Sequence, residues 1–199
     1  MDAPPIQYAR TEDGVNIAYW TLGEGPPQIE QPQAPYSHCE CIWQVSWAPN
    51  WFTHLAARRQ IVFFDHRGHG LSDREVSDYS PDAPALDIAA VADRLGLDRF
   101  DLLGAGYPSA GAILFAADHP GRIRLLALWQ PLAHGHASHN TFNDLLPLID
   151  KDFDYYVEGA LRWRNPDLTP QEVCRRACVH PPVRRSTRAA CGLRGLRAG

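Results

Sequence analysis

The chain has 199 residues, of which 45% are hydrophobic, and a formal net charge of −4 at pH 7. This length and composition suffice for one domain with a buried core, and the acidic balance gives no basis for nucleic-acid binding. The first residues contain no secretory signal pattern, and no apolar run approaches the roughly 18 residues that span a bilayer. Five cysteines in such a chain predict reduced thiols and a cytoplasmic protein with no membrane partner.

Strand and helix patterns alternate along the chain from residue 60 onward. The expected elements are a strand at 60–65, a helix at 83–95, a strand at 99–103, a helix at 109–118 and a strand at 123–129. Pro84 lies near the start of the first helix and Gly96 just after its end, positions that these residues favour. The alternation predicts an α/β fold with a mostly parallel sheet, helices on both faces and a site at the carboxyl ends of the strands.

Residues 61–73, IVFFDHRGHGLSD, join an apolar run to a glycine-rich turn. They match the pattern D-x-R-G-x-G-x-S and so resemble a signature of the α/β-hydrolase superfamily, through Asp65, Arg67, Gly68, Gly70 and Ser72. We interpret this turn as structural rather than catalytic, because glycine-rich turns of this kind leave parallel strands. Residues 6–27 resemble the leading hairpin of the superfamily, and residues 37–52 resemble a bacterial subset of it.

Residues 97–122 resemble the strand, tight turn and helix that present the nucleophile in this superfamily, the nucleophile elbow. In that arrangement the serine lies two positions after the small residue that ends the strand. Gly104 is that small residue here, so Gly106 takes the nucleophile position, and glycine has no side chain that could attack. The resemblance implies that Tyr107 would offer its backbone N–H to an oxyanion. It also implies an ancestral hydrolase of an ester, lactone or similar acyl substrate, with no cofactor and no metal.

Ser109 is the only hydroxyl nucleophile near the elbow, three residues beyond the expected position. A serine at the start of a helix commonly caps backbone N–H groups, and we favour this role over that of a substitute nucleophile. A nucleophile also needs a base within hydrogen-bond reach. No histidine follows at the place that the superfamily implies, because the last one, His180, lies in a segment without pattern. The sequence therefore predicts a pseudoenzyme.

Residues 28–35, QIEQPQAP, stand where the superfamily has an apolar strand that leads into its oxyanion loop. Three glutamines and two prolines predict at best a short or frayed strand here. If Ser37 and His38 align with the corresponding pair of the superfamily, Pro35 takes the position of an oxyanion donor. Proline has no N–H to donate.

We divide the chain into a hydrolase core at 1–135, a partial helical cap at 136–172 and an unpatterned basic tail at 173–199. The superfamily carries its acid and its histidine on two further strands, which this sequence does not match. The sequence thus predicts a truncated or frame-shifted chain, whose sheet has an unpaired apolar edge beside residues 123–129.

Within that sheet, we expect residues 100–104 to form a central strand between residues 61–64 and residues 123–128. Gly106 should lie at the tight turn that enters the next helix. Four side chains should be buried around this strand and helix, each stabilising the fold by about 1.5–3 kcal/mol if fully buried: Leu102, Leu103, Ile113 and Leu114.

Three histidines, His134, His136 and His139, follow the strand predicted at 123–129. Imidazoles at this spacing can share a zinc ion, as in the strand-end run of metallo-β-lactamase-type hydrolases. Ser138 stands where that run has an aspartate, and the preceding chain predicts a different fold. We therefore interpret these histidines as a polar loop.

The cysteines offer no complete metal site. Cys174, Cys178 and His180 could supply part of one, but Cys191 is the only other thiol nearby. GAGYPSAG, residues 104–111, lacks the third glycine and the later acidic residue of a nucleotide fingerprint. We interpret all five cysteines as free thiols: Cys39, Cys41, Cys174, Cys178 and Cys191.

Two classes of function follow from these patterns. One is an ester or acyl hydrolase of the α/β-hydrolase fold, working with atypical residues on a small-molecule ester or acyl ligand. The other is a chain that is inactive, either as a non-catalytic ligand-binding or interaction module or as a decayed fragment. Glycine at position 106 favours the second class.

Overall fold

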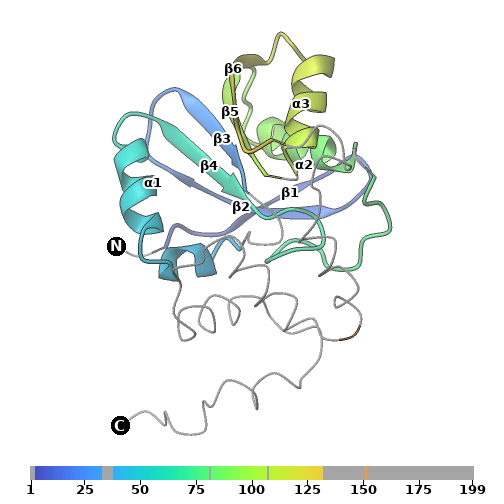
Figure 1. Ribbon diagram of the computed structural model, residues 1–199, viewed down its shortest axis with the longest axis horizontal. Helices are drawn as coiled ribbons and strands as arrows, with labels where there is room; N and C mark the ends of the chain where they lie inside the picture. Colours follow the sequence, from blue (N-terminus) through green and yellow to red (C-terminus); the bar gives the residue numbers. More distant parts are fainter. Residues whose placement is uncertain (1–2, 33–37, 81, 107, 132–150, 152–199) are drawn as a thin grey trace, which may run out of the picture. The chain divides into compact units, whose positions relative to one another are not determined.

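The computed structural model describes residues 3–32, 38–80, 82–106, 108–131 and 151 (Figure 1). The chain divides into two compact units, residues 1–137 and 138–199, and every element named below belongs to the first. Its sheet has six strands in the order β1-β2-β4-β3-β5-β6. The strands are β1 (Gln7–Arg10), β2 (Asn16–Leu22), β3 (Pro27–Gln31), β4 (Gln60–Phe64), β5 (Phe100–Ala105) and β6 (Ile123–Trp129).

The sheet is mostly parallel, as the alternation of strand and helix patterns predicts. The leading hairpin pairs β1 with β2 in antiparallel fashion, and β2 then pairs antiparallel with β4. The remaining three pairs, β4 with β3, β3 with β5 and β5 with β6, are parallel. The carboxyl ends of these four parallel strands therefore lie at one edge of the sheet, where α/β folds place their sites.

Helices cover both faces of this sheet, which confirms the predicted α/β architecture (Figure 1). α1 packs on one face, and α2 and α3 pack on the other. A short 3₁₀ helix, η1, precedes α1. The bounds are η1 (Cys41–Gln44), α1 (Ala48–Ala56), α2 (Ala83–Arg94) and α3 (Ser109–Asp118).

The side chains of β4 alternate between two cores, because successive residues of a strand point to opposite faces. Ile61 and Phe63 join the cluster beneath α1, where the Trp20 ring stacks on Phe63 at 5.2 Å and meets Phe52 edge-on at 4.9 Å. Val62 and Phe64 join the cluster beneath α2. A continuous apolar run, as in residues 61–64, is thus what a strand buried on both faces requires.

The predicted order of the strands is wrong at one place. β5 is central, but its neighbours are β6 and β3, not β6 and β4. β3 has only five residues, as its composition suggests, yet it is not frayed, because it pairs along its length with both β4 and β5. Because β3 is polar in composition, the sequence did not indicate that it is an interior strand.

The predicted burial around β5 is right for one side chain and wrong for three. Leu102 is buried with 1% exposure, whereas Leu103, Ile113 and Leu114 are only half-buried. Leu103 points to the same face as α1, and no described helix covers that face at β5. In α3 the fully buried apolar side chains are Ala112 and Phe115, so Ile113 and Leu114 flank the contact rather than form it.

Gln31, the last residue of β3, carries an amide that has no partner among the residues that the structure describes. Its side chain is 1% exposed, and neither Nε2 nor Oε1 makes a hydrogen bond. The residue pairs with Gly104 of β5 and follows Ile29 by two positions, so its amide lies on the apolar face beneath α2 and α3. A buried amide without partners destabilises the fold by its full desolvation cost.

Replacing Gln31 by methionine should therefore stabilise the protein. Methionine has a similar length and no strong polar group, so Gln31→Met should raise the free energy of unfolding by about 1–3 kcal/mol. Urea unfolding followed by circular dichroism measures the change. Gln28→Met is the matched control, because the Gln28 amide donates a hydrogen bond to Glu30 and its loss should destabilise. A Gln31→Met variant less stable than the parent would show that the amide is satisfied in solution.

Glu30 is a second polar residue inside β3, on the opposite face. It is 6% exposed, its Oε1 accepts a hydrogen bond from Gln28 Nε2 at 3.0 Å, and Trp51 of α1 also contributes a hydrogen bond. Burial raises the pKa of the Glu30 carboxyl to about 7. The two hydrogen bonds act to lower this pKa, but burial has the larger effect. The protonated acid is thus the form that the folded sheet favours.

This raised pKa predicts a loss of stability with rising pH. Below about pH 4.5, the ordinary pKa of the group, Glu30 makes its full contribution to the free energy of unfolding. This contribution, about 3 kcal/mol, is lost as the pH rises through about 7. Glu30→Gln cannot ionise, so its stability relative to the parent should increase between about pH 5 and about pH 8. Urea unfolding of both proteins across this range measures the difference. A stability difference between the two proteins that does not change with pH would contradict the raised pKa of Glu30.

Candidate functional site

The turn between β5 and α3 lies at the carboxyl edge of the parallel strands, where the sequence places the site. Gly106 adopts φ 65°, in the left-handed region that favours glycine. Its N–H donates to the Trp129 carbonyl of β6 at 2.9 Å, and its carbonyl accepts the N–H of Ser109 at 3.1 Å. The backbone therefore turns sharply at Gly106 and enters α3 at Ser109. Gly106 itself has no side chain to project from this turn.

Ser109 is the first residue of α3 and is completely buried. Its Oγ donates a hydrogen bond to the Gly106 carbonyl at 2.6 Å. A helix cap would instead accept a bond from a backbone N–H, so this bond differs from the expected one. The hydroxyl thus supports the turn by donating to its carbonyl.

Several predicted site residues lie outside the described residues. These are Tyr107, the proposed oxyanion donor, and Pro35 with the rest of residues 33–37. The histidines His134, His136, His139 and His180 lie outside as well, as do Cys174, Cys178 and Cys191. The structure thus places Gly106 and Ser109 together at one turn.

The Asp65 carboxylate is the centre of the glycine-rich turn. It is 0% exposed and accepts N–H bonds from Cys39 at 2.9 Å and from Leu71 at 2.9 Å. Burial raises its pKa, although both N–H bonds act to lower it. A Cβ atom at Gly70, where φ is 51°, would overlap this carboxylate, so only glycine fits there. Ser72 Oγ donates to the Asp65 carbonyl at 2.7 Å.

Arg67 forms a buried network with two aspartates from distant parts of the chain. Its Nε donates to Asp87 of α2 at 2.9 Å, and its terminal nitrogen bonds Asp13, in the turn after β1, at 2.7 Å. The Arg67 side chain is 3% exposed and that of Asp87 is 0% exposed. Burial raises the pKa of Asp87 to about 6, while Arg67 acts to lower it. These contacts support the structural interpretation of the motif, because its side chains bind the fold itself.

Replacing Arg67 tests how much the buried network contributes to the free energy of unfolding. Arg67→Met leaves the Asp87 carboxylate without its counter-ion and should lower the free energy of unfolding at neutral pH by about 3–5 kcal/mol. The loss should shrink as the pH falls towards about 6, because Asp87 without Arg67 takes up its proton above that pH, and it should be constant where Asp87 is protonated in both proteins. The control is Arg122→Met, which loses a far more exposed ion pair with Asp93 and a hydrogen bond to the Leu97 carbonyl and should cost about 1–2 kcal/mol. Equal losses in the two variants would contradict the network.

His66 is a buried imidazole that the sequence reasoning missed. Its Nε2 lies 2.7 Å from the Pro32 carbonyl just after β3, and a carbonyl can only accept, so Nε2 carries the proton. Burial lowers the pKa of His66 to about 4, so the ring is neutral and a poor base at neutral pH. The only signal in the sequence was its place at the variable position of the D-x-R motif.

The two described cysteines are free thiols, as predicted. Burial raises the pKa of the Cys39 thiol well above its ordinary value and also raises that of Cys41. Neither is therefore the low-pKa type of thiol that reacts readily. Among the residues that the structure describes, no three His, Cys, Asp or Glu side chains gather to hold a metal ion, and no helix is long and apolar enough to cross a bilayer.

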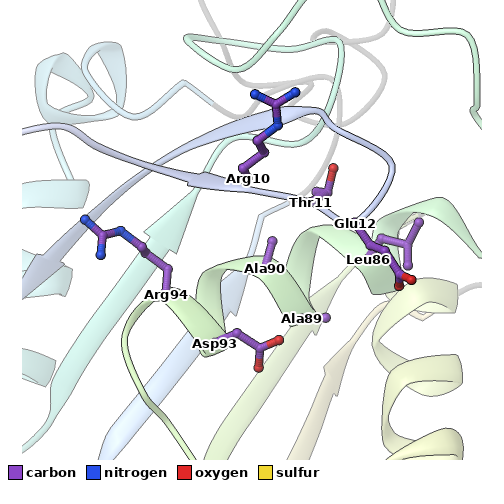
Figure 2. A pocket seen from close by; sticks show the side chains of 8 residues that line it. All are labelled: Arg10, Thr11, Glu12, Leu86, Ala89, Ala90, Asp93 and Arg94. Carbon is purple, nitrogen blue, oxygen red and sulfur yellow. The ribbon is translucent and has the colours of Figure 1, made fainter.

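A separate groove of about 560 Å³ lies between the end of β1 and α2 (Figure 2). Its floor is apolar, and Figure 2 shows Arg10 and Arg94 extending away from it. None of its lining residues belongs to the turn between β5 and α3. The lining residues are Arg10, Thr11, Glu12, Leu86, Ala89, Ala90, Asp93 and Arg94. Two cations and two anions in this set leave no net charge to attract a ligand.

Comparison with known sequences supports the same fold. The family model described as the alpha/beta hydrolase fold matches residues 38–177. A non-heme chloroperoxidase from Streptomyces lividans is 30% identical over 146 residues, which are 69% of this chain and 49% of that protein. A 2-hydroxy-6-oxo-2,4-heptadienoate hydrolase from Pseudomonas putida is 33% identical over 87 residues, which are 42% of this chain and 31% of that protein. The chain spans less than half of the length of the curated relatives that it matches.

Solved structures give the same result at lower identity. The esterase RhEst1 from Rhodococcus sp. ECU1013 superposes with a TM-score of 0.71 at 22% identity, covering 88% of this chain and 70% of that one. A bromoperoxidase from Bacillus anthracis has a TM-score of 0.71 at 15% identity, covering 88% of this chain and 68% of that one. At these identities the likeness concerns the fold alone.

Proposed function

This chain belongs to the α/β-hydrolase fold family, and from that membership we propose that it is a non-catalytic member of the family. The observation that carries the proposal is Gly106, which occupies the tip of the turn between β5 and α3 with φ 65°. The backbone of a nucleophile elbow is present there without a nucleophile. Nucleophilic catalysis needs a side chain that forms the covalent bond, and glycine supplies none.

The neighbouring groups support this proposal. Ser109 is buried, and its hydroxyl donates to the Gly106 carbonyl. His66 already donates through Nε2 to Pro32, and its pKa of about 4 makes it a weak acceptor of a serine proton. The Ser109 proton and the His66 Nε2 proton are thus both directed at backbone carbonyls.

A binding role is the function that we assign to the retained site. The family places its ligands at the carboxyl ends of the parallel strands, and this chain keeps the β5–α3 turn there. We therefore propose a small-molecule ester or acyl compound as the ligand class, bound without turnover. The alternative to ligand binding is that the chain is a decayed fragment that binds no ligand. One relative is named as a hydrolase and one solved structure as an esterase. These names support an ester or acyl ligand for the family, not for this chain in particular.

The purified protein should not turn over p-nitrophenyl acetate or p-nitrophenyl butyrate above a heat-denatured control. Without a nucleophile, only the weak residual effects of binding and oxyanion donors remain. Gly106→Ser should fold, since φ 65° costs a serine only about 1–2 kcal/mol, and it should stay inactive because the new hydroxyl lacks a base. Release of p-nitrophenolate, followed by absorbance, measures both proteins.

A fluorophosphonate probe tests the alternative that Ser109 is the nucleophile. The unmodified protein should not be labelled. Labelling that disappears in Ser109→Ala would overturn the proposal and make Ser109 a catalytic residue. Labelling of Gly106→Ser alone would show that a base is present after all.

A further inference from the structure

Every residue that lines the groove between the end of β1 and α2 belongs to the described part of the chain (Figure 2). The volume of about 560 Å³ lies in the range of ligand-binding pockets, roughly 300–1,000 Å³. Leu86, Ala89 and Ala90 of α2 form an apolar floor, and the turn after β1 forms the facing wall. The groove therefore offers both space for a ligand and apolar surface to bury.

The two walls of the groove are held together by the buried Arg67 side chain. Its Nε donates to Asp87 at 2.9 Å, and its terminal nitrogen bonds Asp13 at 2.7 Å. Asp87 directly follows Leu86 of the floor, and Asp13 directly follows Glu12 of the facing wall. The network thus fixes the distance between the walls before any ligand arrives, and a preformed groove lowers the entropy cost of binding.

Two of the four charged residues that line the groove are directed at other parts of the fold. Asp93 forms an ion pair with Arg122 at 2.8 Å. Arg10 extends over the turn after β1, where its Nη2 lies 3.5 Å from the position that a Cβ atom of Gly14 would take. The charges left for a ligand are one carboxylate and one guanidinium, which balance each other.

This carboxylate and this guanidinium lie at opposite ends of the groove. Figure 2 shows Glu12 beside Leu86 at one end and Arg94 at the other. Leu86 and Arg94 belong to the same helix, and at 1.5 Å per residue their positions are about 12 Å apart along its axis. An extended chain spans about 3.3–3.6 Å per residue, so three residues cover about 10 Å of this length. The long side chains of Glu12 and Arg94 can cover the remainder.

We propose that this groove binds a short apolar peptide of about three residues with free termini. The carboxylate of the peptide faces Arg94, its ammonium group faces Glu12, and its apolar side chains cover the floor of the groove. A zwitterion carries no net charge, which matches the balanced charges of the groove. This site is separate from the turn between β5 and α3, so the proposal does not rest on the function proposed for that turn.

Isothermal titration calorimetry of the full chain with leucyl-alanyl-leucine tests this proposal. The free tripeptide should bind, and the same tripeptide acetylated and amidated at its ends should bind at least about fivefold more weakly, because it loses both ion pairs. Leucine has both charges on one residue and reaches only one end of the groove. Octanoate has no cation for Glu12. Both compounds should therefore also bind at least about fivefold more weakly than the free tripeptide.

Two variants test the two ends of the groove separately. Arg94→Met keeps an apolar stem and should weaken the free tripeptide about three- to fivefold, but it should not change the affinity for the amidated tripeptide. Glu12→Gln should have the same effect on the free tripeptide and none on the acetylated one. Both residues are exposed, so both variants should fold as the parent does. Arg58→Met, at an exposed arginine outside the groove, is the matched control and should leave the affinity unchanged.

Several results would overturn the proposal. One is a parent protein that binds no tripeptide at millimolar concentration. Another is equal affinity for the free and the doubly blocked tripeptide, or for octanoate, because the charges at the two ends would then play no part. A loss in Arg94→Met that persists with the amidated tripeptide, or an equal loss in Arg58→Met, would place the binding site elsewhere.

Discussion

The Asp65 carboxylate sits at the carboxyl end of β4 with no exposed surface, and its negative charge is held by backbone N–H groups rather than by a cation. The two donors, Cys39 and Leu71, come from the segment before η1 and from the glycine-rich turn. A carboxylate buried without such donors would destabilise the fold by several kcal/mol, so both segments must stay folded around it. Ser72 extends the arrangement, because its hydroxyl donates to Asp65 and accepts the Ala18 N–H of β2.

Arg67 connects this turn to the helical layer. Because its guanidinium binds both Asp87 of α2 and Asp13 after β1, it fixes α2 against the hairpin on one face of the sheet. α2 in turn packs against α3, which begins at the turn that contains Gly106. The glycine-rich motif therefore positions the functional edge through packing, at a distance from any chemistry. Its side chains are satisfied by hydrogen bonds and ion pairs within the fold itself.

Polar residues lie inside β3, one of the two strands that flank β5. Glu30 and Gln31 occupy β3, between β4 and β5, with exposures of 6% and 1%. Both destabilise the sheet, one through a buried carboxyl and the other through an unpartnered amide. Gly106 follows the neighbouring strand β5, so the carboxyl edge of the sheet carries three residues that the hydrophobic pattern of the strands does not explain.

The sequence by itself determined the leading hairpin and the elements between residues 60 and 129, and it places glycine at position 106. Apolar runs such as residues 61–64, the proline and glycine that bracket α2, and the Gly104-to-Gly106 spacing are local signals, because each depends on backbone conformation or on burial of adjacent residues. The tertiary structure alone decided that β3 lies between β4 and β5 and that neutral His66 donates from Nε2 to the Pro32 carbonyl. It also decided that the Gln31 amide has no partner among the described residues. Strand order and hydrogen-bond partners join residues far apart in the chain, and in β3 pairing with both neighbours outweighed a composition that argues against an interior strand.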